Sequence, residues 1–109
     1  MLIYKILRSD EWAALQAAGE TLGAPVDLAD GYIHFSTAET VAATAAKYFT
    51  DETGLWLLAV DVDACGAALK WEPARDTLFP HLYRSLSLAE VVWAKPLPLG
   101  DDGHIFPEL

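Results

Sequence analysis

A histidine inside a short apolar segment is the side chain of this sequence best placed for chemistry. His34 lies between Ile33 and Phe35 and is followed by Ser36. In an extended segment His34 points to the opposite face from its apolar neighbours, because side chains alternate along a strand. Glu39 stands three residues after Ser36, a spacing that predicts a capping box at the start of a helix. The pattern predicts an imidazole beside a helix N-terminus, which suits an anion; the alternative is a buried histidine next to an ordinary cap.

A second candidate is the carboxylate of Glu72, beside Trp71 at the end of a predicted strand. Partial burial there would suit Glu72 as a general base or as a stabiliser of developing positive charge. The alternative is an edge carboxylate that is paired with Lys70 or Arg75.

His81 and Tyr83 form a third candidate, because they stand two residues apart and face the same way on an extended chain. An imidazole and a phenol so placed can hold a ribose or a base by hydrogen bonding and stacking. A structural tyrosine and a surface histidine are the alternative.

Three cations, Lys70, Arg75 and Arg84, fall within fifteen positions of one another. They could form a local positive pocket for an anionic ligand, or they could be three solvated side chains. Asp101 and Asp102 precede a glycine in a predicted turn, and their spacing matches no ligand motif, so we predict no metal site.

The composition predicts one domain over residues 1–109, because 109 residues of which 53% are hydrophobic can bury a core without disulfides or bound metals. The net charge of −9 repels phosphate backbones and argues against a nucleic-acid-binding module. A single cysteine, Cys65, excludes an internal disulfide and a Cys-based zinc site. The expected location is cytoplasmic, because the residues from Met1 to Lys5 lack a secretory pattern and no apolar run approaches the roughly 20 residues that span a bilayer. The oligomeric state has no signature in the sequence.

The elements that must position these residues follow from periodicity and turn signals. Helices are predicted over Asp10–Ala18, with Ser9 as its cap, and over Ala38–Phe49, with a short turn at Ser87–Glu90. Strands are predicted at Leu2–Leu7, around His34, at Leu55–Val60, at Leu69–Glu72 with Pro73 ending it, and at Val91–Lys95. We expect a loop at Glu20–Ala29, an edge strand or ordered loop at Leu78–Tyr83, and a tail whose Ile105–Pro107 docks as an edge.

Four strings of residues, in this order, resemble one family. They are Asp27–Thr37, Leu69–Pro73, Leu78–Tyr83 and Lys95–Leu99 with the closing Ile105–Pro107. The sequence is similar over nearly its whole length to the small bacterial family called domain of unknown function 952. That resemblance implies an α+β fold similar to the ADP-ribosyltransferases: a single small domain with a split, mixed but mostly antiparallel β-sheet, two principal helices and NAD in a central cleft.

The more distant resemblance to the ADP-ribosyltransferases implies roles for individual residues. His34-Phe35-Ser36 is similar to the His-Gly-Ser/Thr string of those enzymes, which implies that His34 contacts the ribose and that Ser36 or Thr37 supports its strand. Phe35 departs from the pattern, because it stands where those enzymes carry a glycine against the nicotinamide. Glu72 is the candidate for their catalytic glutamate, although no motif aligns it.

Two hypotheses about function follow from these residues. The first is an enzyme acting on NAD or a nucleotide, in which His34 orients the sugar, Glu72 stabilises a positively charged centre and Arg75 or Arg84 meets phosphate. The second is a non-catalytic module that binds a small molecule or a protein. A pocket shared by His34 and Glu72 would favour the enzyme.

Overall fold

The computed structural model describes residues 1–109 as a succession of short strands and helices. The strands are β1 (Leu2–Arg8), β2 (Glu20–Thr21), β3 (Ile33–His34), β4 (Leu55–Asp61), β5 (Leu69–Ala74), β6 (Thr77–Leu82), β7 (Leu86–Ser87), β8 (Val91–Leu97), β9 (Leu99–Gly100) and β10 (Gly103–His104). The helices are α1 (Ser9–Ala18), α2 (Pro25–Asp30), α3 (Val41–Tyr48), α4 (Val62–Cys65) and the 3-10 turns η1 (Gly66–Ala68) and η2 (Leu88–Glu90). No helix has both the length and the apolar character needed to cross a bilayer.

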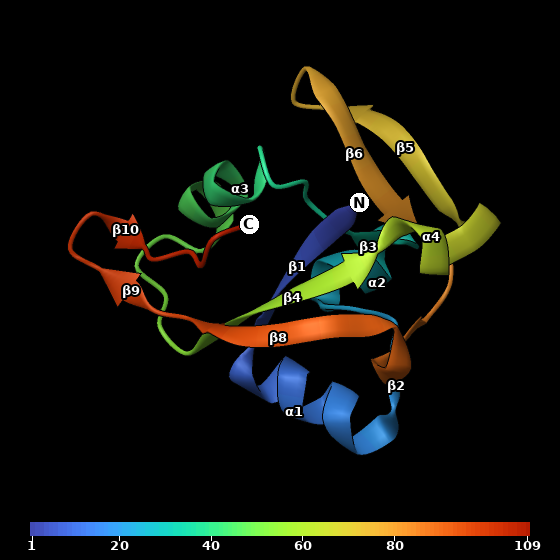
Figure 1. Ribbon diagram of the computed structural model, residues 1–109, viewed down its shortest axis with the longest axis horizontal. Coiled ribbons are helices and arrows are strands. Elements are labelled where there is room, and N and C mark those ends of the chain that lie inside the picture. The colour runs from blue at the N-terminus through green and yellow to red at the C-terminus, as the bar shows by residue number, and fades with distance from the viewer.

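The first sheet has the antiparallel order β1-β4-β8 (Figure 1). It carries buried apolar clusters on both faces. β4 is its central strand, as the uninterrupted apolar run predicts, and Leu57 and Leu58 on its two faces are fully buried. Leu57 belongs to the cluster that includes Val41 and Ala45 of α3, whereas Leu58 packs with Leu15 of α1. The two main helices therefore cover opposite faces of this sheet.

The second sheet has the antiparallel order β3-β6-β5. Its register sets Ile33 opposite Leu82 and His34 opposite His81. Because side chains alternate, Ile33 and Leu82 enter the core while the two histidines share the other face. The sheets meet at an isolated antiparallel bridge between Tyr4 and Ser36, with two hydrogen bonds of 2.8 Å. The split arrangement is thus present, but every strand pairing is antiparallel, so the expectation of a mixed sheet is wrong.

Two prolines sit within strands where the sequence predicts interruption. Pro80 lies in β6, the central strand of its sheet, and not on an edge or in a loop. Its carbonyl accepts a hydrogen bond from the Phe35 amide at 3.0 Å, just beyond the end of β3. The ring nitrogen of Pro80 faces the same side as this carbonyl, toward β3. The missing N–H therefore removes no hydrogen bond between β6 and β5. Pro73 likewise does not stop β5, which continues through Ala74 as an edge strand.

Both main helices begin at a different residue from the one predicted. Arg8, not Ser9, is the N-cap of α1, and its amide donates to Glu11 Oε1 at 2.8 Å. α3 begins at Val41 with Thr40 as its N-cap, so the capping box between Ser36 and Glu39 is wrong. The Thr40 hydroxyl accepts from the Thr37 amide at 2.9 Å, which holds a turn where the helix was expected to start.

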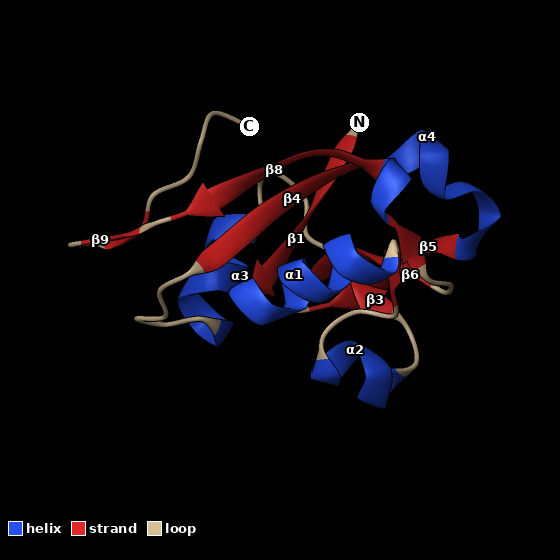
Figure 2. Cartoon of the chain, turned by 90° about the horizontal axis from the view of Figure 1, so that it is seen from below, coloured by secondary structure: helices blue, strands red, loops and turns tan.

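The segment predicted as a loop at 20–29 contains β2 and most of α2. Pro25 at the first helical position and Gly31 in a left-handed C-cap bound α2, which is the pattern typical of a short helix. Figure 2 shows α2 set off below β3 and β6, with loops on both sides. In the tail, β9 and β10 form a hairpin around the predicted Asp101-Asp102 turn, and 105–107 adds no strand.

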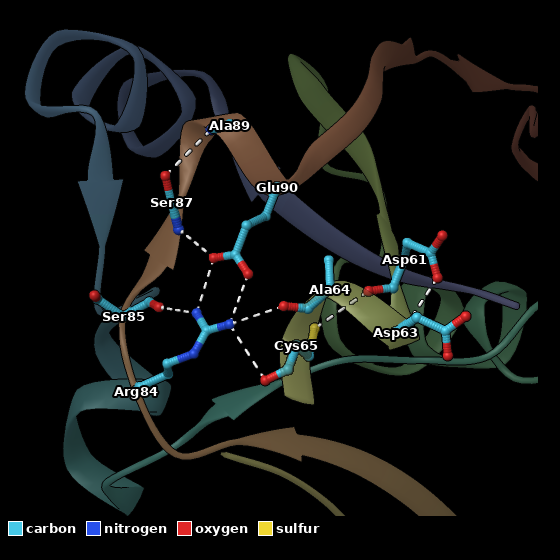
Figure 3. Close-up of polar contacts among 9 residues, drawn as sticks. All are labelled: Asp61, Asp63, Ala64, Cys65, Arg84, Ser85, Ser87, Ala89 and Glu90. Carbon is cyan, nitrogen blue, oxygen red and sulfur yellow. Dashed lines mark hydrogen bonds and ion pairs between the residues drawn. The ribbon is translucent and has the colours of Figure 1, made fainter. Parts of the chain in front are cut away.

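Arg84 joins the chain after β6 to the end of α4 (Figure 3). Its guanidinium forms two hydrogen bonds to the Glu90 carboxylate, at 2.6 and 2.8 Å, and two to the carbonyls of Ala64 and Cys65, both at 3.2 Å. These bonds satisfy carbonyls at the end of a helix, where helical partners are missing. Cys65 itself is buried, and burial raises the pKa of its thiol. Arg84 therefore has a structural role.

We expect Arg84→Gln to lower the free energy of unfolding by about 1–2 kcal/mol, because it removes a two-point pair with Glu90 and a helix C-terminal contact. The matched control is Arg75→Gln, since Arg75 contacts no carboxylate. Urea denaturation of both variants measures the difference. Equal losses in the two variants would contradict the structural role of Arg84.

Candidate functional site

A cavity of about 590 Å³ opens where the two sheets diverge. β1 forms one wall through Tyr4 and Ile6, and β3 and β6 form the opposite wall through His34, Phe79 and His81. Residues of α2, α3 and the β5–β6 turn complete the lining, with Val26, Asp30, Tyr32, Thr44, Tyr48 and Arg75 among them. A volume of this size lies within the range of small-molecule sites.

A buried ion pair lies behind the cavity and fixes His34. The Asp27 side chain is fully buried, and its Oδ2 lies 2.7 Å from the Nζ of Lys5. Its Oδ1 lies 2.6 Å from His34 Nδ1 and accepts from the His34 amide at 3.0 Å. Oδ2 also accepts from the Ala24 amide at 2.7 Å. With both oxygens occupied, Asp27 holds the imidazole in one orientation and favours a proton on its Nδ1.

The charges of this pair depend on each other. Burial raises the pKa of Asp27, but the ammonium of Lys5 and the hydrogen bonds from Lys5 and His34 outweigh it, so the pKa of that carboxyl is lowered. Burial lowers the pKa of Lys5, and the carboxylate of Asp27 opposes that shift. The charged form of Asp27 is stabilised because four hydrogen-bond donors surround its carboxylate.

The other nitrogen of His34 faces the cavity. Its Nε2 lies 2.9 Å from Asp30 Oδ2, and the Asp30 side chain is 46% exposed. Asp30 is the last residue of α2 and belongs to the cavity lining. His34 is therefore held between a buried carboxylate on Nδ1 and a half-exposed carboxylate on Nε2.

His81 has a carboxylate of its own. Its Nδ1 lies 2.8 Å from Glu72 Oε1, and the Tyr83 hydroxyl donates to the same oxygen at 2.6 Å. The hydrogen bonds from Tyr83 and His81 lower the pKa of Glu72, and the bond to Glu72 raises the pKa of Tyr83 to about 12. The Tyr32 ring stacks on His81 at 4.2 Å between centroids and meets Tyr83 edge-on at 5.1 Å.

Arg75 supplies positive charge to the cavity. It lies in the tight turn between β5 and β6 with a positive φ of 48°, and its guanidinium sits over the Phe79 ring at 4.3 Å. One nitrogen donates to Thr44 Oγ1 at 3.0 Å, and the Ser36 hydroxyl donates to the same atom at 3.1 Å. Arg75 forms no ion pair, whereas the other guanidinium of the lining, that of Arg8, is paired with Glu52.

The structure gathers most of the predicted site residues but not all. His34, Ser36, Arg75 and His81 line the one cavity, whereas Glu72 is not part of its lining and reaches it through His81. Tyr83 contacts Glu72, and Thr37 is buried at the turn before α3. The three predicted cations do not form one pocket, because Arg84 is bound to Glu90 and Lys70 lies over the Tyr83 ring at 5.3 Å.

Three important residues were missed from the sequence: Lys5, Asp27 and Tyr32. Lys5 alternates with apolar residues along β1, and no pattern in the sequence indicates its buried partner. A signal for Asp27 was available, because Pro25 and Gly31 bracket a helix that brings it back toward His34. Tyr32 stands immediately before β3, where its ring lies against both histidines.

Comparison with known proteins places this geometry in a family. The model of the family described as "protein of unknown function (DUF952)" matches residues 6–94. The crystal structure of protein CC0527 from Caulobacter crescentus is 48% identical to this chain, covers 95% of it and 92% of its own length, and superposes with a TM-score of 0.92. The solution NMR structure of CC0527 is 49% identical, covers 94% and 90% of the two chains, and gives a TM-score of 0.84. No curated protein matches the sequence. The chain belongs to the DUF952 family.

Proposed function

We propose that the cavity around His34 binds a small anionic, nucleotide-like molecule, with NAD as one candidate, in a cleft similar to that of the ADP-ribosyltransferases. The observation that carries the proposal is the lining itself: an oriented imidazole, a cation with no carboxylate partner and several aromatic rings face one cavity of about 590 Å³. A polar anchor, a phosphate partner and stacking surfaces are what a nucleotide requires.

The charges within the site support an anionic ligand despite the net charge of −9. Lys5 is neutralised by Asp27, and Arg8 by Glu52. Arg75 has N–H donors left over beyond its single hydrogen bond to Thr44, and packing on the Phe79 ring orients its guanidinium. A guanidinium in this state suits bidentate contact with a phosphate.

Binding is better supported than ADP-ribosyl transfer. Transfer would place Glu72 against the sugar, but its carboxylate accepts hydrogen bonds from His81 and Tyr83 and is not in the lining. Phe35 belongs to the core cluster of Ile33 and Leu82 and also lines the cavity, where the ADP-ribosyltransferases carry a glycine. The proposal therefore assigns ligand contact to His34, Ser36, Arg75 and His81, and leaves transferase activity by Glu72 as a separate prediction. A ligand of this class is at hand in the cytoplasm, where we expect the protein to act.

Titration with NAD, ADP-ribose and AMP, followed by amide chemical shifts and thermal unfolding, tests the proposal. A ligand at a hundredfold excess over its Kd stabilises the folded state by about 2.7 kcal/mol. We expect shifts to concentrate at the cavity and Arg75→Gln to weaken binding by about tenfold, since it removes a charged contact to phosphate. Lys95→Gln is the control, because Lys95 lies over Trp93 on β8 and outside the lining. Unchanged shifts and melting temperature with all three molecules would refute the proposal.

A further inference from the structure

Two histidines, each with a carboxylate on its Nδ1, stand side by side in the cavity wall. We propose that His34 and His81 form a general acid–base pair that hydrolyses a phosphodiester of the bound nucleotide. The inference rests on the proposed function, because it names the reaction that the same site performs on its ligand.

The fold fixes the distance between the two rings. His34 on β3 and His81 on β6 are direct cross-strand partners, so their side chains leave the sheet on one face. Their ring centroids lie 5.3 Å apart with the planes 70° to each other. Tyr32 lies against both rings, at 4.7 Å from His34 and 4.2 Å from His81, and so restrains their orientation.

In each ring a carboxylate occupies Nδ1, and in His34 a second carboxylate, that of Asp30, lies 2.9 Å from Nε2. Asp27 holds His34 Nδ1 at 2.6 Å, and Glu72 holds His81 Nδ1 at 2.8 Å. His81 Nε2 has no hydrogen-bond partner. Every buried side-chain nitrogen or oxygen of the protein has such a partner, so this atom is not fully buried, although the residue as a whole is only 5% exposed. His34 Nε2 meets only the 46% exposed carboxylate of Asp30, which a bound ligand would displace. An oriented imidazole with an available Nε2 is the arrangement of a general base or acid.

The reaction follows from this pair. Neutral Nε2 of one histidine takes a proton from water while the water oxygen bonds to phosphorus, and the P–O bond to the leaving oxygen breaks. Protonated Nε2 of the other histidine gives its proton to that leaving oxygen. The products are a phosphomonoester and a free hydroxyl, and proton exchange with solvent resets both rings. Arg75 in the same lining offsets charge on the non-bridging oxygens.

Every titratable group around the pair bears on its pH dependence. Asp27 and Asp30 of α2 face His34, with Lys5 of β1 behind Asp27. Glu72 of β5 faces His81, Tyr83 donates to that carboxylate, and Lys70 is the cross-strand neighbour of His81. The hydroxyl-bearing ring of Tyr32 packs against both imidazoles.

Hydrolysis of 2′,3′-cyclic AMP, followed by ³¹P NMR on the purified protein, tests the inference. We expect turnover with a bell-shaped pH–rate profile, because one imidazole must be neutral and the other protonated. His34→Asn and His81→Asn should each lower kcat by about 10²–10⁴-fold. His104→Asn is the matched control, since His104 bonds the Glu52 carbonyl outside the cavity and its loss should leave kcat unchanged.

Amide spectra of each variant establish that it is folded, and titration with the cyclic nucleotide measures its binding. Glu72→Gln keeps the shape of the side chain and should lower kcat with little change in affinity, as expected of a positioning residue. Binding without hydrolysis by the wild-type protein would overturn the acid–base pair and leave the proposed function standing. Absence of both binding and hydrolysis would overturn the acid–base pair, whereas the titration with NAD, ADP-ribose and AMP decides the proposed function separately. Full activity of folded His34→Asn or His81→Asn would also overturn the pair.

Discussion

Replacement of Asp27 by alanine lowers the free energy of unfolding by about 3–5 kcal/mol, the usual cost of breaking a buried ion pair on one side. The loss is large because Lys5, whose side chain is 8% exposed, remains in the core without a counter-charge. The amides of Ala24 and His34 lose their acceptor in the same step. Urea denaturation followed by circular dichroism measures the change.

Two further variants show whether charge, and not shape, accounts for that loss. Asp30→Ala, on the same helix but 46% exposed, should change stability by less than about 1 kcal/mol. In the double variant Lys5→Met, Asp27→Leu, no buried charge remains, so it should be more stable than Asp27→Ala alone. A single Asp27→Ala variant as stable as Asp30→Ala would contradict a buried ion pair.

The same pair gives stability a pH dependence of known sign. The pKa of Asp27 is lower in the folded protein than its ordinary value of 3.8. The stabilisation is therefore fully present above that ordinary value and disappears as the pH falls through the lower folded value. Acid denaturation of the wild-type protein should thus be steeper than that of the double variant, which has no carboxylate at this position.

Replacement of Leu57 by alanine should lower the free energy of unfolding by about 2–5 kcal/mol. Leu57 is fully buried in the middle of β4, where it contacts the cluster of Tyr4, Val41 and Ala45. Both neighbouring strands are hydrogen-bonded to β4, so the backbone has little freedom to close around the lost volume.

The matched control is Leu78→Ala, which removes the same atoms from a side chain that is 52% exposed on β6. Its expected change is within about 0.5 kcal/mol. Denaturant midpoints at a common m-value compare the two variants directly. Similar midpoints would mean that β4 is not the centre of the core.

The parts of the fold that the sequence predicted are those fixed by local patterns. The apolar run at 55–60 predicted the buried β4, helical periodicity predicted α1 through Ala18, and the turn predicted at Ser87–Glu90 is η2. Predictions from prolines and helix caps were wrong where tertiary contacts determine the local structure. Pro80 is tolerated in a central strand because its ring nitrogen faces the point where β3 has ended, which no local pattern reveals.

The candidate site was predictable to the extent that strand alternation fixes it. His34 was identified from its place between two apolar residues, and His81 from its place two before Tyr83, but their cross-strand pairing depends on register. Lys5 and Asp27 were not predicted as partners, because twenty-two positions separate them along the chain and only the folded state brings them to 2.7 Å.

The single bridge between Tyr4 and Ser36 bears on how a ligand enters. The two walls of the cavity belong to sheets that are separately hydrogen-bonded, and these two residues provide the backbone pairing between them. Beyond this seam the two sheets are joined by side-chain packing, because Ile3 and Val60 of the first sheet share a buried cluster with Ile33 and Leu82 of the second. The width of the cavity is therefore set by how these side chains pack, and not by a continuous ladder of strand pairs.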